Sequence, residues 1–154
     1  MYEVHMYIET NCTSPRRMER WYGYVLEYEM QNGRPITRES FGRITGTYHQ
    51  ATLRAIDEAL ARLTKECELY IHTPDEFIVD MVENNLETWA ECGFLSCRGL
   101  PVANQKEWMT FWEKSRSHFV FMICDKHPYS GWMRSEIERK EREYDTNKRS
   151  LGAG

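Results

Sequence analysis

The sequence predicts an α/β domain built on a five-stranded mixed sheet with helices on both faces. Three segments before Thr47 have the alternation or the aromatic and β-branched content of strands. Apolar residues then recur at helical spacing, and two short apolar segments further along are typical of buried strands separated by helices. Strands in hairpins, followed by strands that alternate with helices, imply a mixed sheet.

The first third of the chain predicts an antiparallel meander. Val4–Glu9 alternates between apolar and polar residues, and the aromatic-rich segment 21–30 suits a second strand. Asn32-Gly33 favours a tight hairpin turn before a third strand at 35–45.

Helices dominate the rest of the predicted order. Thr47 is expected to cap a helix that runs to about Lys65, and Thr73 a second helix with Pro74 at its first position. The other predicted elements are strands at 68–72 and 118–124 and helices at 86–92, 104–116 and 131–144. We therefore expect one domain at 1–144 and a flexible polar tail at 145–154.

Composition narrows the class of protein. The 154 residues carry a formal charge of −4, which disfavours a nucleic-acid binder that relies on accumulated positive charge. The N-terminus lacks the pattern of a signal peptide and no apolar run could span a bilayer, so a cytoplasmic location is expected. The five cysteines form no CxxC pair, and Cys92 and Cys97 lack the second pair that a zinc site needs.

Four segments carry motifs of a known family. They read Y-I-E-T-N-C at 7–12, G-T-Y-H-Q-A-T-L-R-A at 46–55, L-Y-I-H-T-P-D-E-F-I at 69–78, and W-A-E-C-G-F with G-L-P-V-A-N and Trp108 at 89–108. They are similar to T-D-G-S-C, T-N-N-x-x-E-L-x-A, S-T-D-S-x-Y-V and W-x-x-x-G-W with K-P-V-x-N of bacterial type I ribonuclease H. The resemblance covers residues 1–140 and implies an RNase H-like fold.

The resemblance also implies a site whose acids have been replaced. Family members cleave the RNA strand of RNA–DNA hybrids with two divalent metals held by four carboxylates. The four positions correspond to Glu9, Thr52, Pro74 and, at or near it, Ser135, so one of them is acidic. Because two metals need several anionic oxygens, this vestigial set predicts that no metal cofactor is bound.

A rearranged site is the alternative. Asp75 and Glu136 each lie one residue beyond a family position, and His127 lies in the loop where the family carries a mobile histidine. With Glu9 they could hold Mg²⁺ or Mn²⁺. Asp75 is, however, also typical of a first helical turn, and Glu136 of an exposed face with alternating charges.

The expected substrate contacts are altered as well. Thr47 keeps a phosphate-binding position, but the paired asparagines that follow are Tyr48 and His49, and the basic K-K-R handle is replaced by residues 90–92 (A-E-C). The region is acidic, with Glu83, Glu87 and Glu91. Arg16, Arg17 and Arg20 in the first loop are interpreted as a solvated basic cluster.

Three functions remain open. The first is a catalytically degenerate RNase H-like protein that binds a protein partner, for instance as a phage or mobile-element modulator of a nucleic-acid enzyme. The second is a divergent metal-dependent ribonuclease H that cleaves RNA in RNA–DNA hybrids, and the third is a nucleic-acid binder that does not cleave. The predicted partner-contact residues are the three glutamates above and, if exposed, the rings of Trp21, Tyr22, Tyr24 and Tyr28.

Overall fold

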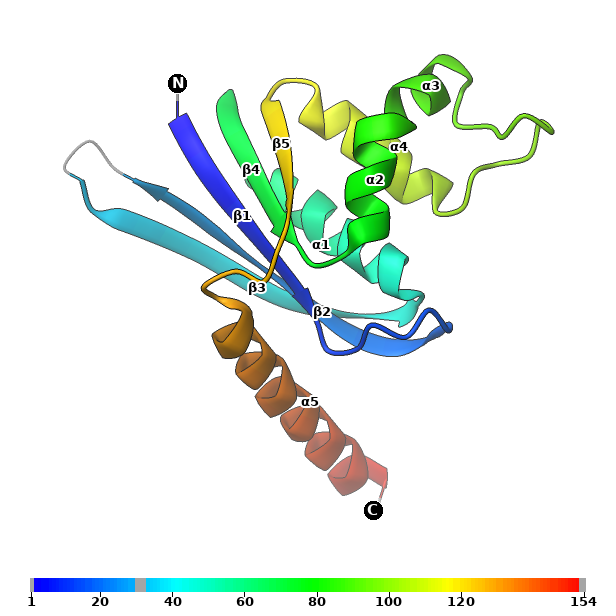
Figure 1. The fold of residues 1–154 in the computed structure, drawn as a ribbon. Helices are drawn as coiled ribbons and strands as arrows, with labels where there is room; N and C mark the ends of the chain where they lie inside the picture. The colour runs from blue at the N-terminus through cyan, green and yellow to red at the C-terminus, as the bar shows by residue number, and fades with distance from the viewer. Residues whose placement is uncertain (1, 30–32, 153–154) are drawn as a thin grey trace.

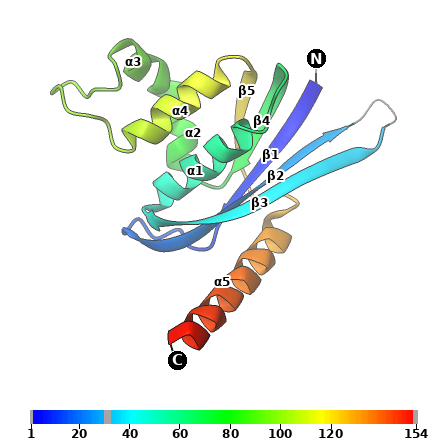
Figure 2. The same cartoon turned by 180° about the vertical axis from the view of Figure 1, so that it is seen from behind.

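One five-stranded sheet in the order β3-β2-β1-β4-β5 organises the chain. The structure is a computed structural model and describes residues 2–29 and 33–152. Helices α1–α4 cover one face of the sheet, and α5 lies against the other (Figures 1 and 2). The elements are β1 (Tyr2–Thr10), β2 (Met18–Glu29), β3 (Pro35–Gly46), α1 (Tyr48–Leu60), β4 (Cys67–Thr73), α2 (Glu76–Asn84), α3 (Leu86–Glu91), α4 (Gln105–Ser115), β5 (Phe119–Cys124) and α5 (Ser130–Gly152).

The pairing of the strands confirms the predicted mixed sheet. β1 pairs antiparallel with β2, and β2 with β3, whereas β1 pairs parallel with β4, and β4 with β5. The carboxyl ends of the three parallel strands therefore meet at one edge of the sheet. In α/β folds this edge is where functional side chains gather.

The core lies between the sheet and α1–α4. Met6 and Ile8 point from β1 into it and are fully buried together with Ile56 of α1. Trp108 of α4, 1% exposed, packs edge-on against Trp89 and Phe111, so this helix contributes aromatic rings to the core.

The first loop is held by Arg20, whose predicted exposure is wrong. Its side chain is fully buried and donates hydrogen bonds to the carbonyl oxygens of Gly46, Cys12, Ser14 and Arg16, at 2.9, 2.8, 2.8 and 2.5 Å. β2 begins at Met18, before the start that the aromatic residues predict, and this turns Arg20 inward. Arg16 and Arg17 remain exposed.

Three helix boundaries differ from the prediction, and the first is the end of α1, which lies at Leu60 instead of about Lys65. The cap of α2 is Asp75, whose Oδ1 accepts a hydrogen bond from the Ile78 amide at 3.2 Å, and Thr73 and Pro74 lie before the helix. α5 continues to Gly152, through most of the predicted tail, and residues 153–154 lie outside the described part of the chain. The predicted cap Thr47 of α1 is confirmed, because its hydroxyl accepts from the Gln50 amide.

The predicted hairpin turn falls partly outside the described residues. Asn32 is not described, and Gly33 has a φ of +78°, which suits glycine in a turn. Within the described residues, no helix has the length and apolar character needed to cross a bilayer.

Candidate functional site

The site predicted by the family motifs lies at the carboxyl edge of the parallel strands. β1 supplies Glu9, 2% exposed, next to the N-terminal turns of α1, α2 and α5. α1 contributes Tyr48 and His49, and Asp75, 1% exposed, caps α2. The site is thus lined by helix N-termini, whose free amides favour negative charge.

Glu9 is paired with a cation from α5. Nε of Arg134 lies 3.5 Å from Glu9 Oε2, and the arginine side chain is 54% exposed. Glu9 is therefore a buried carboxylate whose charge is balanced by a guanidinium that reaches in from the surface.

His127 lies beside the same carboxylate. Its Nε2 is 3.7 Å from Glu9 Oε1 and 3.1 Å from the carbonyl oxygen of Ile8, and its buried Nδ1 has no hydrogen-bond partner among the described residues. A proton on Nε2 satisfies the carbonyl oxygen of Ile8, so Nε2 is assigned as the donor of this hydrogen bond. The permanently charged partner of Glu9 is the Arg134 guanidinium.

Asp75 belongs to a second, separate pair. Its Oδ2 lies 2.8 Å from Nδ1 of His49, whose ring packs against Phe77. Since its Oδ1 accepts from the Ile78 amide, both carboxylate oxygens already have partners. Asp75 is a helix cap with a histidine neighbour in this structure.

Tyr48 is a buried phenol in the first turn of α1. Burial, followed by the negative charges of Asp75 and Glu9, raises the pKa of the Tyr48 phenol well above its ordinary value. The side chain therefore remains protonated at neutral pH.

The remaining predicted ligand positions bring no further carboxylate to Glu9. Thr52 is buried and uncharged, and Ser135 is exposed on α5. The Glu136 side chain interacts with a residue of its own helix. Its Oε2 accepts a hydrogen bond from Arg139 at 2.8 Å, and this hydrogen bond lowers the pKa of Glu136. The structure brings Glu9 and His127 together, but it leaves Asp75 and Glu136 with other partners.

This donor set does not fit the two divalent metals that the family resemblance implies. Glu9 is the one carboxylate at the four family positions, and the cation nearest to it is already a guanidinium. Within residues 2–29 and 33–152, no three His, Cys, Asp or Glu side chains converge as a metal-binding group. No step of a metal-assisted reaction can be derived from these residues.

Arg134 is the residue that sequence reasoning missed. The family motif directed attention to Ser135, and the neighbouring arginine looked like part of a charged helix face. One signal in the sequence could have indicated Arg134. It is a basic residue next to an expected metal ligand, and a cation at that place replaces the positive charge of the metal.

The predicted contact surface is only partly exposed. Tyr22 and Tyr24 are buried against the α1 side of the sheet, so their predicted role in a surface patch is wrong. Trp21 packs edge-on against Tyr144 of α5, and Tyr28 is half-buried. The inward-facing positions of β2 meet α1. Large exposed rings lie instead on β5, at Phe119 and Phe121.

The three glutamates predicted as partner contacts are exposed. Glu83 lies on α2, and Glu87 and Glu91 lie on α3, which precedes the protruding loop seen in Figure 1. They occupy the region where the resemblance implies a basic handle.

Comparison with known proteins supports the sequence resemblance. No family model matches the chain. Ribonuclease H of Campylobacter curvus is 28% identical over 120 residues, 78% of this chain and 77% of that protein. Ribonuclease H of Symbiobacterium thermophilum is 29% identical over 126 residues, 78% of this chain and 79% of that protein. Both relatives are thus similar to this chain over more than three quarters of its length.

Solved structures support the fold. LC9-RNase H1, described as a type 1 RNase H with the type 2 active-site motif, superposes with a TM-score of 0.71 at 18% identity, over 90% of this chain and 70% of that one. A foamy viral protease-reverse transcriptase in complex with an RNA/DNA hybrid gives 0.61 at 12% identity, over 88% of this chain and 19% of that one. The chain has an RNase H-like fold, and its sequence resembles bacterial type I ribonuclease H.

Proposed function

We propose that this chain is a catalytically degenerate RNase H-like protein that acts by binding a partner. The observation that carries the proposal is the Glu9–Arg134 pair, 3.5 Å between Oε2 and Nε. A guanidinium at this distance repels a divalent cation and satisfies the carboxylate that would otherwise hold it. Thr52, Pro74 and Ser135 supply no anion to offset that repulsion.

The proposed partner is a protein with a basic contact surface. Glu83, Glu87 and Glu91 are exposed on α2 and α3, where a hybrid-binding enzyme of this resemblance would be basic. Like charges disfavour the phosphates of a nucleic acid there, whereas a positive protein patch would be complementary. That the chain is a phage or mobile-element modulator of a nucleic-acid enzyme stays a prediction.

Restoring the acids tests the loss of metal chemistry. We expect the natural chain to leave an RNA–DNA hybrid intact in Mg²⁺ or Mn²⁺. The combined variant Thr52→Glu, Pro74→Asp and Arg134→Asp should gain Mn²⁺ affinity by at least tenfold in calorimetry, since it removes a cation and adds three carboxylates. Arg139→Asp, which makes the same charge change as Arg134→Asp alone but on an exposed turn of α5, is the control for that part of the variant and should gain nothing.

A divergent ribonuclease H is the second candidate, favoured by the similarity to curated enzymes of that name. It uses the rearranged set of Glu9, Asp75, Glu136 and His127 with Mg²⁺ or Mn²⁺. Hybrid cleavage by the natural chain that disappears in both Glu9→Gln and Glu136→Gln would establish this candidate and contradict the first.

A further inference from the structure

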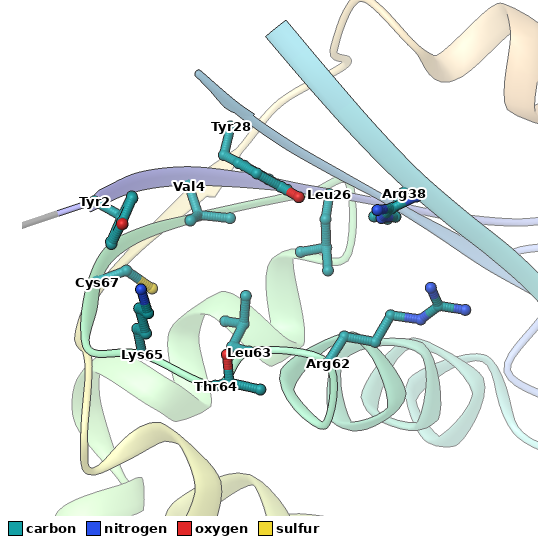
Figure 3. A pocket seen from close by; sticks show the side chains of 10 residues that line it. All are labelled: Tyr2, Val4, Leu26, Tyr28, Arg38, Arg62, Leu63, Thr64, Lys65 and Cys67. Carbon is teal, nitrogen blue, oxygen red and sulfur yellow. The ribbon is translucent and has the colours of Figure 1, made fainter. Parts of the chain in front are cut away.

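A groove on the α1 face lies at the opposite end of β1 from Glu9. It has a volume of about 560 Å³, within the range of small-molecule sites, and opens where α1 has ended and the strands continue (Figure 3). Its apolar floor is formed by Val4 of β1, Leu26 of β2 and Leu63 after α1.

Three cations line this groove. Arg38, Arg62 and Lys65 are all exposed, and no carboxylate is among the lining residues. None of the three makes an ion pair within the described part of the chain, although Lys65 lies over the ring of Tyr2 and Arg62 over that of Tyr24. This is a concentration of uncompensated positive charge on a chain whose net charge is −4.

Strand alternation explains this separation of charge. Arg38 pairs with Leu26 across β2 and β3, so both side chains lie on the groove face. Glu27 and Glu39 are the next residues along these strands and point to the other face. In Figure 3, Arg38 and Arg62 lie at one end of the groove and Lys65 and Tyr2 at the other.

We propose that this groove binds a small amphipathic organic anion. A phosphate or carboxylate head lies between Arg38 and Arg62, where it relieves the repulsion of the two guanidinium groups. An aliphatic or aromatic body lies over Val4 and Leu26 and removes the exposed surface of the half-buried Leu63 and Tyr28 from water. The site is independent of Glu9 and of the proposed loss of cleavage.

The test uses the fluorescent anion 1-anilinonaphthalene-8-sulfonate on the full chain. We expect saturable binding of one dye per chain, weakened at least tenfold by the double variant Arg38→Gln/Arg62→Gln. Arg98→Gln combined with Lys148→Gln, which removes the same charge elsewhere on the surface, is the matched control and should bind as the natural chain does. Thermal melts of every variant establish that it is folded.

Two further measurements separate the parts of the proposal. Thr64→Trp, at an exposed groove position, should block the dye by filling space while all the cations remain. Decanoate and adenosine monophosphate then compete with the dye: displacement by the first assigns an aliphatic carboxylate, and by the second a nucleotide. Equal dye affinity in the double variant and the natural chain, or displacement by neither competitor, overturns the proposal.

Discussion

At the scale of single residues, the buried acids of the domain differ in how their negative charge is compensated. Glu9 has Arg134, and Asp75 has His49 and the amide of Ile78. Asp57 on α1 is different, because its Oδ1 is buried without a hydrogen-bond partner among the described residues. An uncompensated buried carboxylate disfavours its charged form.

Asp57 therefore makes stability fall as the pH rises. Burial raises the pKa of Asp57 from 3.8 to about 8, so between these values the folded chain holds a proton that the unfolded chain has released. The free energy of unfolding then decreases by about 1.4 kcal/mol per pH unit from this group.

Asp57→Asn should remove that slope. We expect the variant to match the natural chain near pH 4 and to exceed it increasingly up to pH 8, measured by urea unfolding at fixed ionic strength. Glu113→Gln, on the outer side of α4, is the control. Parallel pH profiles for the Asp57 variant and the natural chain would show that the pH dependence does not come from Asp57.

At the scale of elements, β2 and β3 pack against each other through aromatic rings on one strand that lie over glycines on the other. Gly23 pairs with Phe41 and Tyr22 with Gly42, on alternate faces of the two strands. A Cβ at Gly23 would lie 2.4 Å from Phe41 Cδ1, and one at Gly42 would lie 2.5 Å from the Tyr22 oxygen. Each glycine thus leaves the space that the ring on the neighbouring strand occupies.

Gly23→Ala should consequently destabilise the fold by about 1–3 kcal/mol, the usual cost of forcing an extra methyl into packed surroundings. Phe41 would have to leave its place against Met133 and Tyr7. The measurement is chemical denaturation, with Gly131→Ala as control because no heavy atom lies within 4 Å of a Cβ there. A loss no larger than the control's would mean that Phe41 moves freely.

At the scale of the whole molecule, Tyr144 connects the long helix α5 to the sheet. Cζ of Arg43 lies 3.8 Å from the centre of the Tyr144 ring, and Trp21 packs edge-on against the same ring. These two contacts hold α5 against the sheet. The helical turns beyond it are exposed.

A chain ended after Tyr144 should keep its stability within about 0.5 kcal/mol of the full chain, because the removed turns are solvated. Tyr144→Ala in the full chain should lose about 1 kcal/mol through the cation–π contact and the ring packing. Paired unfolding curves check both, and a shortened chain that melts like Tyr144→Ala would place residues 145–152 in the folded domain.

The positions of the strands along the chain could be predicted from local periodicity, and the five-stranded mixed sheet from the resulting element order and the family motifs. Each of these signals lies in a continuous segment of the sequence. The prediction failed for Arg20, whose four carbonyl partners lie on segments that only the folded chain brings together. It failed for Tyr22 and Tyr24 because alternation gives two faces without saying which one α1 covers. The role of Arg134 could not be predicted because its partner, Glu9, lies 125 residues away along the chain.

The Glu9–Arg134 pair also constrains the order in which this site could change by mutation. Loss of Arg134 first would leave a carboxylate with 2% exposure without the half-exposed guanidinium that balances its charge, and this lowers stability. A new acid beside Glu9 would instead give the same guanidinium a second partner. A lineage could therefore return to metal binding by acquiring acids before it loses the arginine, and the reverse order would pass through a less stable intermediate.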